Sequence, residues 1–189
     1  MPRPAGAFGY SARHMLMLIR HLLSIAALPL TVAVLVPIWI ARGYSVAYSH
    51  PTTAIAWASV VCGVASLAVG LTLFAASLGH FAVKGRGTLA PWDPPKRLVV
   101  SGPYRWVRNP MISGVGFVLL AETLILRSMP HAIWTGGFLV VNAIYIPLIE
   151  EPSLADRFGD AYREYCRHVH RFWPRLRPWS QPTSPSTFS

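Results

Sequence analysis

Long stretches without charged residues dominate the chain, and clusters of basic residues separate them. The stretches cover residues 22–41, 43–83, 111–126 and 128–149, and Glu122 is the one charged residue inside them. About 20 apolar residues are needed to cross the hydrocarbon core of a bilayer as a helix. The pattern therefore predicts an all-α, polytopic membrane bundle with four or five transmembrane helices.

The third stretch is short for a membrane span. Residues 111–126 reach about 24 Å at about 1.5 Å per residue, whereas the hydrocarbon core is about 30 Å thick. Arg127 ends this stretch, and Ser128, Met129, Pro130 and His131 at the start of the fourth stretch form a break so brief that it predicts a helical hairpin.

Composition and charge agree with a membrane protein. The chain is 53% hydrophobic and 13% charged, whereas soluble domains carry about 25% charged residues. The net charge of +10 comes from basic residues before residue 22, between residues 84 and 108, and after residue 156; Arg42 and Arg127 stand alone in the other two connections. Because basic residues mark cytoplasmic loops, this distribution predicts a multi-pass inner-membrane protein with both termini in the cytoplasm. Topology and attraction to anionic lipid explain the charge, so no nucleic-acid partner is expected.

The segments between and after the helices differ in character. The connector, residues 84–110, contains several prolines and glycines together with aromatic residues, so we expect a folded loop that holds a ligand. Residues 150–174 carry apolar positions at helical spacing and predict an amphipathic helix along the membrane surface. The Ser-, Thr- and Pro-rich stretch 175–189 predicts a disordered tail, although Trp179 within it resembles an interfacial anchor. In the second helix, small residues recur every four positions and predict a close helix contact: Ala54, Ala58, Cys62, Ser66 and Gly70.

The hairpin should bring polar residues together. Arg108 and Asn109 stand at the start of the third helix, and Glu150 and Glu151 stand at the end of the fourth. Two interpretations remain open on geometry alone. The residues form either a ligand site or an ion-pair staple at the membrane surface.

These residues also carry a family resemblance. Gly102-Pro103-Tyr104-Arg105, Arg108-Asn109-Pro110 and Glu150-Glu151, followed by Leu154, Phe158-Gly159, Tyr162 and Tyr165, resemble the signature of the isoprenylcysteine carboxyl methyltransferase and phospholipid methyltransferase superfamily. The resemblance covers about residues 84–174. It implies a methyltransferase-like, cofactor-binding region there, preceded by two transmembrane helices in residues 1–83.

The resemblance implies an enzyme that moves a methyl group from S-adenosylmethionine to a lipophilic acceptor. The implied cofactor-binding residues are Leu98, Val99, Tyr104, Asn109, Pro110, Met111, Ile112 and Glu150. Arg108 and Glu151 are the expected catalytic residues, and Arg105 and Glu122 are the expected substrate-binding residues.

The acceptor stays open at this point. A carboxylate of an isoprenoid or prenylcysteine-like compound needs no general base, whereas the amine of a phospholipid must lose a proton, for which Glu151 or Glu122 is the candidate base. Ile146 stands where the prenylcysteine enzymes carry a substrate-binding Arg, which weakens the case for prenylcysteine itself. A non-catalytic membrane subunit that binds lipid or a partner is the alternative from another class. No metal is expected, because Cys166, His168 and His170 are two positions apart and face different sides of a helix.

Overall fold

The computed structural model describes residues 28–84 and 98–180. Within these residues all regular structure is helical, which confirms the all-α prediction. The start of the first apolar stretch, part of the connector and the end of the predicted tail lie outside the described residues.

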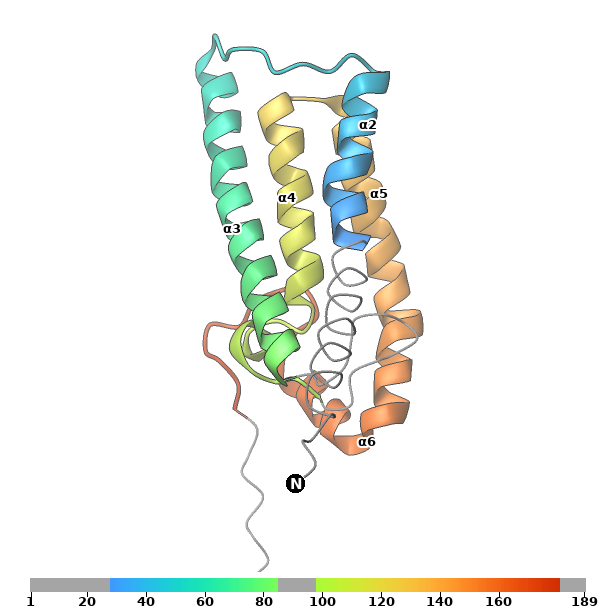
Figure 1. The fold of residues 1–189 in the computed structure, drawn as a ribbon. Helices are drawn as coiled ribbons and strands as arrows, with labels where there is room; N and C mark the ends of the chain where they lie inside the picture. The colour runs from blue at the N-terminus through green and yellow to red at the C-terminus, as the bar shows by residue number, and fades with distance from the viewer. Residues whose placement is uncertain (1–27, 85–97, 181–189) are drawn as a thin grey trace, which may run out of the picture.

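The helices of the described residues form four rods, and these lie side by side (Figure 1). The first joins η1 (Thr31–Leu35) to α2 (Val36–Gly43), and α3 (Ala54–Lys84) and α4 (Pro110–Leu126) form the second and third. The fourth runs through α5 (Met129–Tyr145) and η3 (Ile146–Glu150) into α6 (Glu151–His168), which is kinked at Gly159. A short 3-10 helix, η2 (Gly102–Arg105), precedes α4.

The predicted hairpin joins α4 to α5, and its turn is tighter than the sequence indicated. Arg127 adopts a left-handed conformation with φ of 49°, and Ser128 caps α5 by accepting a hydrogen bond from the His131 amide. Proline is well tolerated in the first turn of a helix. Met129 and Pro130 therefore already belong to α5 and are not part of the turn.

The outward faces of the rods are apolar. Two helices are long and apolar enough to cross a membrane, Ala54–His80 and Met129–His168, and few of their residues are buried in the protein. Leu28–Gly43 and Pro110–Leu126 are shorter apolar helices, so a count of four or five spans stays a prediction.

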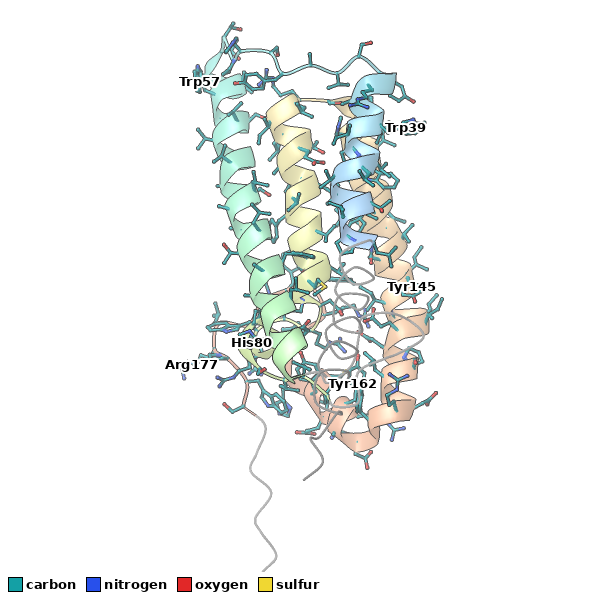
Figure 2. All side chains as sticks on the ribbon, viewed as in Figure 1. Trp39, Trp57, His80, Tyr145, Tyr162 and Arg177 are labelled. Carbon is teal, nitrogen blue, oxygen red and sulfur yellow. The ribbon has the colours of Figure 1, made fainter. Side chains whose placement is uncertain are left out.

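Exposed aromatic side chains mark both ends of the bundle. Trp39 is 73% exposed and Trp57 is 56% exposed, and both lie near the hairpin turn, whereas Tyr145 lies toward the other end (Figure 2). Trp and Tyr concentrate where a membrane meets water. Their arrangement agrees with a bundle embedded in a bilayer.

The helix contact predicted from small residues forms within the chain, between α3 and α4. Its residues differ in part from the predicted stripe, because Ala54, Ala58 and Cys62 are exposed. Small residues at alternating spacings of three and four form the actual contact face, and that spacing keeps one side of a helix toward a neighbour. They are Ser59, Gly63, Ser66 and Gly70.

The closest approach occurs at two glycines that face each other. A β-carbon on Gly70 would lie 2.8 Å from the carbonyl oxygen of Gly114, and one on Gly114 would lie 2.9 Å from that of Gly70. Hydroxyl groups add interhelical hydrogen bonds, from Ser66 to the Phe117 carbonyl at 2.8 Å and from Ser59 to the Leu124 carbonyl at 2.7 Å. This contact fixes where the first residues of α4 stand relative to the end of α3.

Candidate functional site

The candidate site lies at the connector end, which we define as the end of the bundle with residues 98–109 and 169–180. Gly102 begins η2 with φ of 57°, and its α-carbon lies directly against the imidazole of His80 near the end of α3. Only a glycine fits readily, since a side chain would be strained at this φ and would overlap the ring. The lack of a side chain at Gly102 therefore lets the connector pack against the end of α3.

The C-terminal segment, residues 169–180, runs beside the connector and is bonded to it through the backbone. The Arg108 amide donates to the His170 carbonyl at 2.9 Å, and the amides of Arg175 and Trp179 donate back to the carbonyls of Trp106 and Arg105. The Arg105 side chain also donates to the Trp179 carbonyl at 2.7 Å and to the Ser180 hydroxyl at 2.6 Å. Arg105 thereby joins the two segments, and its role in substrate binding stays a prediction.

A small apolar core closes this end of the protein. Tyr162, Tyr165, Val169 and Trp179 are buried in it, and Leu98 and Val100 of the connector pack against them. The predicted tail from residue 175 therefore begins with a packed segment, and Trp179 lies inside this core instead of standing as an interfacial anchor. The Tyr165 hydroxyl donates to the Tyr104 carbonyl at 2.6 Å, which fixes the connector over α6.

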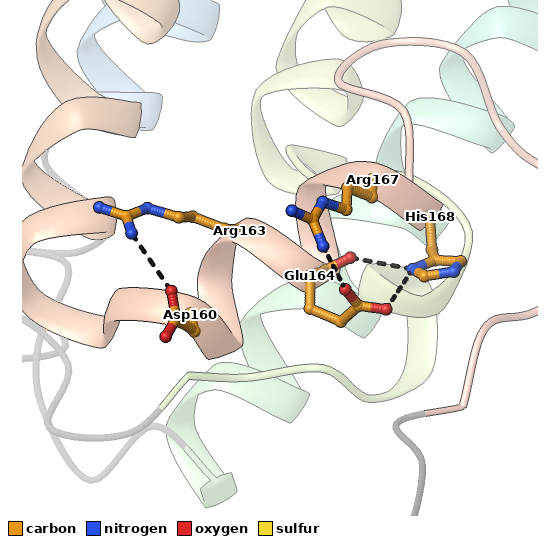
Figure 3. A network of polar contacts seen from close by, with 5 residues as sticks. All are labelled: Asp160, Arg163, Glu164, Arg167 and His168. Atoms are coloured by element: carbon orange, nitrogen blue, oxygen red, sulfur yellow. Dashed lines mark hydrogen bonds and ion pairs between the residues drawn. The ribbon is translucent and has the colours of Figure 1, made fainter.

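The amphipathic character of α6 is confirmed, and Gly159 bends the helix. Gly159 has φ of 56° and ψ of −133°, so the residues after it leave the axis of α5 and turn beneath the bundle (Figure 1). The outer face carries exposed ion pairs, Arg163 with Asp160 and Arg167 with Glu164 (Figure 3). The inner face presents Tyr162 and Tyr165 to the core.

The acidic pair at the end of the fourth rod meets the arginine that precedes α4, as the hairpin predicts. The Glu151 carboxylate lies 3.2 Å from Arg108 Nη1 and accepts two hydrogen bonds of 2.7 Å from Arg171. Arg108 Nη1 also donates to the Cys166 sulfur at 2.6 Å. The hydrogen bonds that Arg171 donates to Glu151 raise the pKa of the Arg171 guanidinium.

Glu150 and Tyr104 form the second half of this cluster. Glu150 follows Ile149, the last residue of the charge-free stretch. Burial raises the pKa of its carboxyl, with a further contribution from the Glu151 charge. Burial, followed by the Glu150 charge, raises the pKa of the Tyr104 phenol. The Tyr104 phenol therefore stays neutral, and the Glu150 carboxyl is close enough for its charge to affect the Tyr104 pKa.

The start of α4 borders the cluster. Asn109 is the N-cap, yet within the described part of the chain its side chain makes no capping hydrogen bond. Pro110 is buried and begins the helix, and Met111 and Ile112 follow half-buried in the first turn. Val99, the other predicted cofactor contact in the connector, is also buried.

Glu122 lies apart from the other predicted site residues. It stands 12 positions after Pro110, about 18 Å along the helix at about 1.5 Å per residue. Its Oε2 is buried and has no hydrogen-bond partner among the described residues. A groove at the hairpin end, lined by Thr53, Ser59, Thr123 and Arg127 among others, is likewise remote from the cluster.

Some residues of the site carry no recognisable signal in the sequence. Arg171 follows α6 as one basic residue among several, and its pairing with Glu151 depends on the course of the C-terminal segment. His80 carries no motif either. Helical periodicity did place Tyr162 and Tyr165 on one face of a helix. It did not predict that they would form the core next to Tyr104.

Comparison with known proteins decides the family. The model of the phospholipid methyltransferase family matches residues 58–161, more than half of the chain. The chain belongs to the phospholipid methyltransferase family. Neither a curated protein nor a solved structure matches it significantly.

The family match reaches further toward the N-terminus than the motifs do. It begins within α3, so this phospholipid methyltransferase family member shares the α3–α4 contact region as well as the connector. It ends just after Gly159, before Arg171 and Trp179. Membership and the apolar helices together identify a membrane methyltransferase.

Proposed function

We propose that this protein transfers a methyl group from S-adenosylmethionine to a lipophilic acceptor at the connector end of the bundle. The observation that carries the proposal is the grouping of Tyr104, Arg108, Glu150 and Glu151 where α4 begins and the fourth rod leaves its apolar part. Two residues come from each of two segments that lie more than 40 positions apart in the sequence. The grouping is a product of the fold.

The residues present fit the chemistry of this cofactor. S-adenosylmethionine carries two positive groups and a carboxylate, so its site needs an acid, a donor for an anion and an aromatic face. Glu150 supplies the acid and Tyr104 the aromatic face. Arg108 supplies the donor, because its Nε is buried and has no hydrogen-bond partner among the described residues.

Other residues complete the proposed site. Asn109 offers a side-chain amide that makes no helix cap. Leu98, Val99, Pro110, Met111 and Ile112 are half-buried or buried, and we expect their apolar side chains to keep water away from the ligand. When bound, S-adenosylmethionine supplies an electrophilic methyl group on a sulfonium. The protein contributes orientation and a dry environment, in which an anion and the sulfonium attract each other strongly.

The state of Glu151 favours an acceptor that needs no general base. Both oxygens of the Glu151 carboxylate accept hydrogen bonds from Arg171, and Oε1 also faces Arg108, so neither oxygen is free to take a proton from an acceptor amine. This observation supports a carboxylate acceptor, such as an isoprenoid acid or a prenylcysteine-like compound. The reaction then forms a methyl ester.

The family match supports a second acceptor, the amine of a phospholipid. The two products differ chemically. Membranes incubated with the enzyme and a donor labelled on the methyl group should yield a base-labile ester in the first case and a base-stable N-methyl group in the second. A base-stable product would reject the carboxylate acceptor.

Binding tests the proposal before any acceptor is known. Purified protein in detergent should bind S-adenosylmethionine saturably, and Glu150→Ala and Asn109→Ala should each weaken binding about tenfold, since they remove polar contacts to a charged ligand. Glu164→Ala is the matched control, because Glu164 lies on the outer face of α6 and pairs there with Arg167 and His168. Absence of saturable binding would leave the non-catalytic subunit as the better interpretation.

Binding should also depend on pH through Glu150. The pKa of this carboxyl is raised above its ordinary value of 4.5, and only its charged form attracts the positive groups of the ligand. Affinity is therefore full above the raised pKa and falls as the pH drops through it, at a higher pH than for an exposed carboxyl. Glu150→Gln should remove this part of the pH dependence.

We further propose that the connector end faces the cytoplasm, with both termini on that side of the inner membrane. The concentration of basic residues in the connector and after residue 156 supports this orientation. A reporter enzyme that is active only outside the cytoplasm should be inactive when fused to the C-terminus. An active fusion would show that the C-terminus lies outside the cytoplasm and would contradict this orientation.

A further inference from the structure

Arg171 lies outside the residues that the family model matches, yet it makes the strongest polar contact of the candidate site. Its Nε and Nη2 donate to the two carboxylate oxygens of Glu151, each at 2.7 Å. Such parallel bonds between a guanidinium and a carboxylate combine charge with a defined geometry. The pair therefore fixes the orientation of the carboxylate as well as its charge.

Glu151 is shared between two arginines. The side chains of Arg108 and Glu151 are 11% and 15% exposed, and that of Arg171 is 32% exposed. One oxygen, Oε1, faces Arg108 Nη1 at 3.2 Å while it accepts the shorter bond from Arg171. The Arg108–Glu151 contact is thus the looser of the two, and Arg171 determines where the carboxylate lies.

The backbone couples the same residues. The amide of Arg108 donates to the carbonyl of His170, the residue next to Arg171. Arg108 is accordingly held at its backbone by His170 and at its side chain by Cys166 and by Glu151, which Arg171 orients. Its Nε remains buried without a partner among the described residues.

We propose that Arg171 is a positioning residue for the cofactor site, acting through Glu151 on Arg108. This inference rests on the proposed function. Arg171 occupies both oxygens of Glu151 and so prevents the carboxylate from closing on the Arg108 guanidinium in a two-bond pair. The Arg108 Nε–H stays available for the carboxylate of the ligand. Without Arg171, Glu151 turns fully to Arg108 and withdraws that donor.

Substitutions at Arg171 test the proposal through ligand affinity. Arg171→Gln should weaken binding of S-adenosylmethionine about tenfold, because Glu151 is then free to bond to the Arg108 Nε–H that the ligand needs. Arg171→Lys should restore only part of the affinity, since an ammonium lacks the planar fork. Arg163→Gln is the matched control, because it removes the same charge from the exposed Arg163–Asp160 pair (Figure 3). Equal affinity for Arg171→Gln and the control would overturn the inference.

A double-mutant cycle tests the route through Glu151. If Arg171 acts through Glu151 alone, the variant that carries both Glu151→Gln and Arg171→Gln should bind no more weakly than Glu151→Gln. Additive losses would show that Arg171 contacts the ligand or acts by another path, and the proposal would be wrong.

A measurement without ligand separates this inference from the proposed function. Hydrogen exchange of the Arg108 amide, bonded to His170 in the wild type, should speed up in Arg171→Gln and remain unchanged in Arg163→Gln. Wild-type protein that binds no S-adenosylmethionine would refute the proposed function, while the exchange rates would still report the coupling. Wild-type protein that binds it, with unchanged exchange in Arg171→Gln, would refute the role of Arg171 alone. Should Arg171→Gln fail to fold, Arg171→Lys gives the same two readouts.

Discussion

The α3–α4 contact and the connector end are held together by different physics. In the first, glycines and serines let two backbones approach, and the helices fit by shape, because lipid offers no hydrophobic drive for their association. In the second, loops without regular structure are held by backbone hydrogen bonds, a buried core and ion pairs. A change in the first should therefore act on the whole bundle, whereas a change in the second should act on the site.

The largest expected effect comes from filling the contact between the two facing glycines. Gly70→Leu should lower the free energy of unfolding by about 3 kcal/mol, since even a β-carbon there meets the backbone of α4 and overpacking forces the helices apart. Denaturation of the protein in detergent measures this. The same substitution at Gly79, where a β-carbon meets nothing within 4 Å, should be tolerated. Equal losses at both positions would contradict the role of the contact.

A smaller effect is expected where the connector is seated on α3. Gly102→Ala should cost about 2 kcal/mol in unfolding free energy, because an L-residue is strained at positive φ and its methyl group overlaps His80. Combining it with His80→Ala removes the overlap and leaves the strain, so the double variant should recover part of the stability. No recovery would show that His80 does not press on Gly102.

The hydrogen bond beneath the connector should contribute less. Tyr165→Phe removes the donor to the Tyr104 carbonyl and leaves a half-buried acceptor, which costs about 1 kcal/mol. Affinity for S-adenosylmethionine should fall with it, since Tyr104 is placed by this bond. An affinity equal to that of the wild type would show that Tyr104 does not contact the ligand.

The smallest effect is expected from one hydroxyl in the α3–α4 contact. Ser66→Ala removes the bond to the Phe117 carbonyl and should lower the unfolding free energy by about 0.6 kcal/mol, the usual size of such bonds between membrane helices. Thr72→Ala is its control, because that hydroxyl bonds within its own helix to Ala68 and should contribute nothing to the contact. If both variants lose the same amount, shape alone holds the helices.

Particular residues show how much of the fold could be predicted from the sequence. The charge-free stretches predicted the rods, and the brief break at Ser128 to His131 predicted the hairpin, although Met129, Pro130 and His131 already belong to α5. The stripe of small residues located the contact at Ser66 and Gly70 but not at Ala54 or Cys62. A spacing of four drifts around a helix of 3.6 residues per turn, so that stripe leaves the contact face after two turns.

By itself, the sequence determined the helices, the hairpin and the meeting of Arg108 with Glu151, because periodicity and short connections act along the chain. Only the tertiary structure decided that Arg171 would take both oxygens of Glu151 and that Trp179 would complete the core beneath Tyr104. These contacts join residues whose separation in the chain carries no pattern. They arise where Gly159 bends α6 and the following segment returns to the connector, and that return depends on packing and backbone pairing that no local rule expresses.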